Sequence, residues 1–163
     1  MVMDYYDLGS YGRTVTTSSA EAQLWFDRGL VWLYGYNHEE AIVCFEKAIE
    51  HDADCAMAHW GIAYAIGPNY NKPWDDFEPD EKPEALTVAQ NAVAAALKQI
   101  GKLTPVERAL IEALEKRYPD DADVESFDPW HDACADAMRA VHQAHGGDLD
   151  VAVLFAEAIM NRT

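Results

Sequence analysis

Helix start and stop signals divide most of this chain into seven segments, and no strand-type alternation competes with them. Two capping boxes, Ser18 with Glu21 and Thr104 with Glu107, are typical of helix N-termini. Glycine and proline interrupt the periodic pattern between segments, since proline cannot continue a helix. We therefore expect an all-α fold. The expected helices span about residues 18–34, 37–51, 54–66, 83–100, 104–118, 128–145 and 148–163.

The first two segments carry a spaced pattern of large and small residues, formed by Trp25, Gly29, Trp32, Ala41, Phe45 and Ala48. This pattern resembles the tetratricopeptide repeat, a pair of helices that packs through such positions. Arg28 and Ala53 depart from it, because the repeat usually has Leu and Pro there. The segment from Ala56 to Tyr64 has the same texture, with Ala63 where the close-contact glycine is usual, and the match weakens beyond residue 66.

The resemblance implies an α-solenoid of antiparallel helix hairpins that stack into a right-handed superhelix, with about seven helices making three and a half repeats. We expect this solenoid to occupy residues 18–163 as one domain. Residues 1–17 lack helical periodicity and are expected to form an extended N-terminal arm. A 13-residue irregular loop at 67–79 interrupts the second repeat, and loops of this length are often functional.

The charge balance excludes several classes of protein. Twelve basic against 29 acidic residues give a formal net charge of −17. Such a chain repels phosphate, so we expect no nucleic-acid partner and no anionic membrane surface. No apolar stretch approaches the roughly 18 residues that cross a bilayer, and the first residues do not form a secretory signal. Three cysteines without framework spacing favour reduced thiols and a cytoplasmic location.

In the resembled family, the first helix of each pair lines a concave groove. That analogy predicts a largely pre-formed aromatic groove that holds a partner peptide or a small ligand, with loop asparagines fixing its orientation. Acidity favours a cationic partner, and no cofactor is implied. The alternative is that these rings are packing residues of the core. The predicted ligand-binding residues are Phe26, Leu30, Tyr34, His59, Trp60, Tyr64, Asn69, Tyr70, Asn71 and Trp74.

A stripe of soft ligands on the sixth segment suggests a second function, a metal-binding protein or metal-dependent enzyme. It consists of His131, Cys134, Met138, His142 and His145. The five positions span about 21 Å of helix, so at most a pair such as His131 with Cys134, or His142 with His145, could share an ion. Packing explains the stripe equally well. A second set with helical spacing, at positions 51, 55 and 59, is divided by an expected helix break.

Catalytic motifs are absent from the sequence: there is no nucleophile elbow, no glycine-rich phosphate loop and no His-Glu-x-x-His. The sequence therefore favours a binding protein over an enzyme. The last segment has apolar side chains nearly all round, including Val153, Phe155 and Ile159. A terminal helix should present a polar face to solvent, so we expect either a longer solenoid or a homo-oligomer that forms through this helix.

Overall fold

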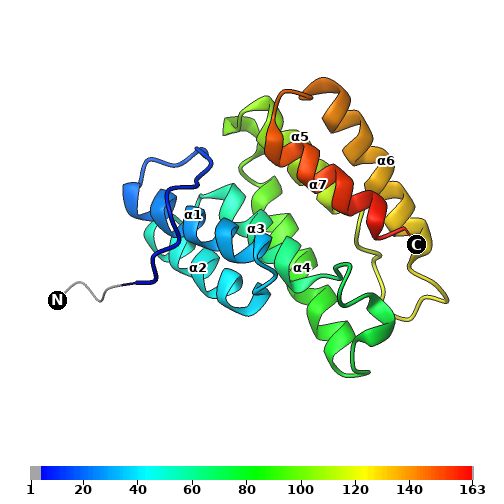
Figure 1. The fold of residues 1–163 in the computed structure, drawn as a ribbon. Coiled ribbons are helices and arrows are strands. Elements are labelled where there is room, and N and C mark those ends of the chain that lie inside the picture. The colour runs from blue at the N-terminus through cyan, green and yellow to red at the C-terminus, as the bar shows by residue number, and fades with distance from the viewer. Residues whose placement is uncertain (1–4, 163) are drawn as a thin grey trace.

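The computed structural model describes residues 5–162, and within that range the chain is all-helical, as the sequence predicts. The seven α-helices are α1 Ala20–Tyr34, α2 His38–His51, α3 Ala56–Ile66, α4 Glu81–Leu97, α5 Pro105–Glu115, α6 Asp128–Ala144 and α7 Leu149–Met160. Two short 3₁₀ turns, Trp74–Asp76 and Ile100–Lys102, lie between them. Each helix packs against the next along the chain, and α3 also contacts α1 and α5 (Figure 1). None of the described helices has the length and apolar character that a bilayer crossing requires.

Three of the expected helix caps are confirmed. The side chains of Asn37, Thr104 and Asp148 accept hydrogen bonds from backbone amides three residues later, and Thr104 forms the full capping box with Glu107. The predicted cap of the first helix was one residue early, because the hydroxyl of Ser19 accepts from the Ala22 amide.

Asp54 was wrongly predicted to cap the third helix. Its carboxylate instead accepts hydrogen bonds from Gln99 and Lys102, which follow α4. Cys55 holds the cap position of α3 without a side-chain hydrogen bond. An aspartate near a helix start therefore serves a longer-range contact here, which local capping rules do not anticipate.

Phe45 of α2 is the central packing residue of the first three helices. Its side chain is fully buried between Gly29 of α1 and Gly61 of α3. A Cβ atom added at either glycine would lie 2.6 Å from a ring carbon of Phe45. Both glycines are therefore needed because the aromatic ring occupies the space of a side chain on each neighbouring helix.

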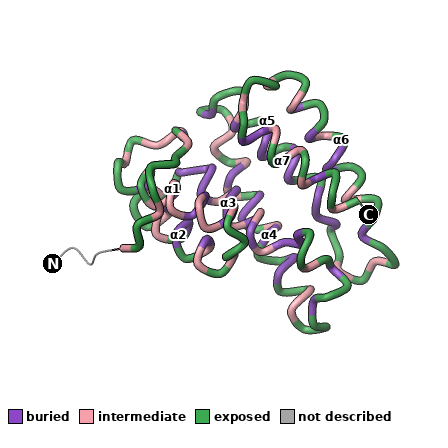
Figure 2. The backbone as a smooth tube through the Cα atoms, in the orientation of Figure 1, coloured by how far each residue is buried: buried purple, intermediate pink, exposed green. Residues whose placement is uncertain are grey.

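The N-terminal arm, residues 5–17, is not helical, and it follows the surface of several helices far away in sequence. Thr16 contacts the α5 residue Glu107 through its backbone amide and its hydroxyl, each at 2.6 Å. Val15 is buried in the core. Figure 2 shows the burial pattern: the purple residues lie along the inner sides of the helices, and the loops are largely exposed.

The segment 67–79 is not an open loop, because contacts with the core and within the segment hold it in place. Trp74 is buried, and its ring stacks on Phe127 with ring centroids 4.7 Å apart. The Asn69 side-chain oxygen accepts from the amides of Asn71 and Lys72, which closes a tight turn. One half of the segment is thus anchored in the core, and the other half forms a surface turn.

Candidate functional site

The structure distributes the ten predicted ligand-binding residues over several environments. Four of them, Phe26, Leu30, Trp60 and Trp74, are buried with 3% or less of their surface exposed. Tyr34, His59 and Tyr64 are half-buried, Asn69 is buried, and Tyr70 and Asn71 are exposed. The ten residues therefore do not form one continuous groove.

Helix α7 contacts two of the predicted ligand-binding residues, Tyr34 of α1 and Tyr64 of α3. The Tyr34 hydroxyl donates to Asp150 at 2.7 Å, and the Tyr64 hydroxyl donates to Glu157. Burial raises the pKa of both phenols well above the usual value, and the carboxylates of Asp150 and Glu157 raise it further. Both phenols thus remain protonated and act as hydrogen-bond donors to α7.

A small inner cavity of about 20 Å³ lies where α3, α5, α6 and α7 meet. Its volume corresponds to about one water-sized sphere. The walls are mostly apolar, and residues of two separate sequence predictions meet in them. The lining comprises Trp60, Tyr64, Leu110, Leu114, Arg117, His131, Cys134, Met138, Leu154, Ala158 and Asn161.

Arg117 is the arginine in the wall of this inner cavity. The sequence did not predict it as a site residue. Its side chain is 3% exposed, its Nη2 donates to the Pro68 carbonyl, and its guanidinium carbon lies 5.0 Å from the ring centroid of Tyr64. Desolvation lowers the pKa of His131, and Arg117 lowers it further. Burial raises the pKa of the Cys134 thiol, which therefore stays protonated at neutral pH.

A second, wider hollow of about 380 Å³ lies between the α1–α2 turn and the 67–81 segment, and we call it the loop cleft. Asn69 and Asn71 line it together with Lys72, which pairs with Glu81. Tyr36, at the turn, adopts a positive φ of 59°, which is uncommon for a residue with a side chain. The remaining lining residues are Asn37, His38, Glu39, Ile42, Ala65, Ile66, Gly67 and Phe77.

Asn69 is the most constrained polar residue of the loop cleft. Its oxygen accepts two backbone amides, at 2.9 and 3.1 Å, while its side-chain nitrogen donates to no group of the described chain. Because Asn69 is 7% exposed and lines the cleft, this nitrogen is a fixed donor. Desolvation lowers the pKa of His38, so its ring is neutral at pH 7.

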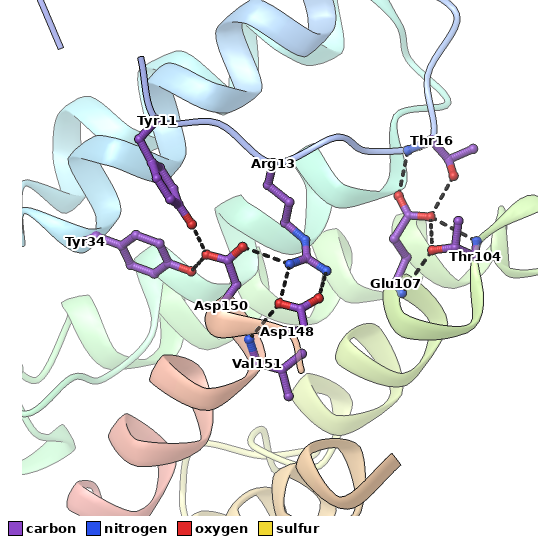
Figure 3. Close-up of polar contacts among 9 residues, drawn as sticks. All are labelled: Tyr11, Arg13, Thr16, Tyr34, Thr104, Glu107, Asp148, Asp150 and Val151. Atoms are coloured by element: carbon purple, nitrogen blue, oxygen red, sulfur yellow. Dashed lines mark hydrogen bonds and ion pairs between the residues drawn. The ribbon is translucent and has the colours of Figure 1, made fainter. Parts of the chain in front are cut away.

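The arm forms a separate polar cluster at the start of α7 (Figure 3). Arg13 donates from both terminal nitrogens to Asp148 and from Nη1 to Asp150, all at 2.8 Å. The hydroxyl of Tyr11 also donates to Asp150, beside that of Tyr34. This cluster joins the arm, α1 and α7, and nothing in the local sequence pattern predicts it.

The potential metal ligands along α6 lie in different environments. His131, Cys134 and Met138 line the inner cavity, whereas the His142 ring stacks on Phe155 at 5.2 Å. Over residues 5–162, no three His, Cys, Asp or Glu side chains lie close enough together to hold a metal ion. His145 is the C-terminal cap residue of α6. On α3, His59 Nε2 lies 3.0 Å from the Ala53 carbonyl oxygen.

A comparison of this chain with protein-family models, curated proteins and solved structures finds no match. The site is therefore interpreted from its own geometry.

Proposed function

We propose that this chain is a TPR-like helical binding module, built as an α-solenoid, that holds a peptide segment or a small polar ligand in the loop cleft. The observation that carries the proposal is the cleft itself, a hollow of about 380 Å³ with the fixed donor of Asn69 in its wall. Ligand sites commonly combine such a concave surface with a few well-placed polar groups.

The loop cleft is favoured over the aromatic groove because its polar groups are accessible. On the α7 side, Tyr34 and Tyr64 already donate to carboxylates of α7. A ligand there would have to compete with these hydrogen bonds, whereas Asn71 and Tyr36 of the cleft are exposed. Backbone carbonyls of an extended peptide are suitable acceptors for the Asn69 and Asn71 amides.

The charge of the chain favours a cationic partner. The net charge is −17, and Glu39 and Glu81 lie in the cleft wall beside a single lysine. A peptide with Lys or Arg would be steered to this surface and would bind less tightly as salt screens the charges.

Fluorescence anisotropy with labelled peptides of basic, neutral and acidic composition tests the proposal. We expect saturable binding of basic peptides and an affinity at least about tenfold lower for the Asn71→Ala and His38→Ala variants. Asn91→Ala, at an exposed position of α4, is the matched control and should bind as the unmodified chain does. Equal affinity of all four proteins, or no binding of any peptide class, would refute the cleft as the site.

Cytoplasmic location and self-assembly through α7 remain part of this proposal. Leu149 and Val153, one turn apart on α7, are exposed by 81 and 54%. Apolar side chains grouped in this way are typical of contact surfaces. Light scattering should give a dimer or larger species whose mass falls in a Leu149→Ser/Val153→Ser variant. A monomer in both cases would exclude assembly through this face.

A further inference from the structure

The N-terminal arm contacts the rest of the chain as a bound peptide would, because side chains of α1 hold its backbone. Gln23 bonds the arm twice: its Oε1 accepts the Val15 amide at 3.0 Å, and its Nε2 donates to the Arg13 carbonyl at 2.8 Å. Asp27 accepts the Arg13 amide at 2.9 Å. Such main-chain bonds hold a non-helical segment whatever its side chains are.

The side chain of Arg13 adds specificity to this backbone recognition (Figure 3). Its guanidinium contacts both oxygens of Asp148 and one oxygen of Asp150, each at 2.8 Å. An arginine matches such paired carboxylates better than a lysine does, because its planar group donates to two oxygens at once. The preceding Gly12 is also selected, since a Cβ atom there would lie 2.8 Å from a carboxylate oxygen of Asp27.

The residues that follow Arg13 extend this pattern. Val15 is buried in the core, and the Thr16 hydroxyl donates to Glu107 at 2.6 Å. The side chain of Thr14 is exposed, so this position accepts different residues. The contacts therefore recognise a segment with the pattern Gly-Arg-x-Val-Thr.

The surface that holds the arm is acidic. We call the side chains that hold residues 12–17 the arm site: Gln23, Asp27, Asp52, Glu107, Asp148 and Asp150. All of them except Gln23 are carboxylates. In a chain with a net charge of −17, such a site attracts cationic segments in preference to neutral or acidic ones.

The arm does not satisfy its own site completely. The Nε of Arg13 is buried and has no hydrogen-bond partner among the described residues. Its Nη1 is shared between Asp148 and Asp150. A buried donor that stays unpaired weakens the interaction. A second segment whose arginine pairs all of its nitrogens can therefore compete with the arm.

We propose that the arm site is a second peptide-binding site, which takes a cationic partner segment of the pattern Gly-Arg-x-Val-Thr, and that residues 12–16 are its built-in competitor. A partner segment binds by displacing the arm, so the arm sets the affinity threshold that a partner must exceed. The inference does not depend on the loop cleft, because the two sites share no residue.

The first experiment uses the full-length Arg13→Met variant, whose own arm lacks the cation. A capped peptide of residues 11–18 is added during thermal unfolding. We expect a saturable rise in Tm of about 3–6 °C at ten times the Kd. The same peptide with Arg13→Gln should bind at least about tenfold more weakly. The peptide with Thr14→Ala is the matched control and should bind equally well, because that side chain is exposed.

The second experiment uses the unmodified chain and does not depend on the folding of a variant. Hydrogen exchange is followed by mass spectrometry with the Thr14→Ala peptide in excess, since its fragments differ in mass from those of the arm. We expect faster exchange at the amides of Arg13, Val15 and Thr16 and unchanged exchange in α2 and α4. The proposal is overturned if the peptide leaves the Tm of Arg13→Met unchanged, if the Arg13→Gln peptide binds equally well, or if exchange in the arm does not respond.

Discussion

The guanidinium of Arg13 lies 2.8 Å from a carboxylate oxygen of Asp150, a residue 137 positions further along the chain. The same guanidinium contacts both oxygens of Asp148, at the N-terminal cap of α7 (Figure 3). A carboxylate at the cap and another in the first turn also suit the positive end of the helix dipole. The N-terminal arm is therefore tied to the last helix by a shared arginine.

Replacement of Arg13 by methionine should destabilise the fold. The side chains of Arg13, Asp148 and Asp150 are largely buried, so the substitution leaves two carboxylates without their cation. We expect the free energy of unfolding to fall by about 2–3 kcal/mol in urea titrations. Lys102→Met, which removes an exposed ion pair with Asp54, is the control and should cost at most about 0.5 kcal/mol. If Arg13→Met and Lys102→Met lost similar amounts of unfolding free energy, the ion pairs of Arg13 would stabilise the fold no more than an exposed pair does.

Acidification should lower stability in two steps. Burial lowers the pKa of His38 and of His131 below 6.5, so the unfolded chain takes up protons first as the pH falls through that value. Because the unfolded state then binds more protons, the free energy of unfolding decreases. Urea midpoints measured from pH 8 to 5 should fall, and His38→Gln should reduce the decrease. Asn91→Ala, at an exposed position without a titratable side chain, should leave the curve unchanged.

The second step of this pH profile lies below pH 4.5. Hydrogen bonds from Arg13 lower the pKa of Asp148, and those from Thr16 and Thr104 outweigh burial to lower that of Glu107. In the unfolded chain the pKa values are 3.8 for Asp148 and 4.5 for Glu107. Each carboxylate stabilises the fold above that pH, and its contribution is lost as the pH falls through the lower pKa of the folded state. Asp27, whose pKa is raised by burial, acts in the opposite direction and offsets part of this loss. A Glu107→Gln variant that shows the same acid limb as the unmodified chain would contradict this assignment.

Local sequence signals predicted the helical class and several caps, because capping and periodicity depend on neighbouring residues. Thr104 with Glu107 is an example, as both partners lie within one turn. The same glutamate also accepts from Thr16, 91 residues away, and that contact has no local signature.

The candidate sites were harder to predict for the same reason. Trp60 and Tyr64 were predicted as ligand-binding residues and line the inner cavity, but the residues of α7 and Arg117 that share its wall come from distant segments. Arg117 follows α5 and precedes Tyr118-Pro119, where an arginine is usually solvated. Its burial depends on the Pro68 carbonyl, which only the tertiary fold places beside it.

The arm should protect one cysteine selectively. All three thiols are buried, and burial raises the pKa of Cys44 and brings that of Cys55 to about 11, so both react slowly. The Tyr5 hydroxyl lies 3.0 Å from Cys44 Sγ. Tyr5→Ala should therefore accelerate the labelling of Cys44 by a thiol reagent, with Cys55 as the internal control. Mass spectrometry of the labelled peptides distinguishes them, and equal acceleration at both sites would indicate general destabilisation instead.

The contact between Phe45 and its two glycines should behave as a coupled unit. Gly29→Ala places a Cβ 2.6 Å from the ring, and such overpacking costs about 1–3 kcal/mol of unfolding free energy. Phe45→Leu also destabilises, but it makes room for the added methyl group. The double variant should therefore lose less than the sum of the two single losses, by at least about 0.5 kcal/mol in urea titrations. Gly101→Ala, where no atom lies within 4 Å of the added carbon, should add to Phe45→Leu without coupling. Strict additivity of Gly29→Ala and Phe45→Leu would show that the ring does not set the size limit at Gly29.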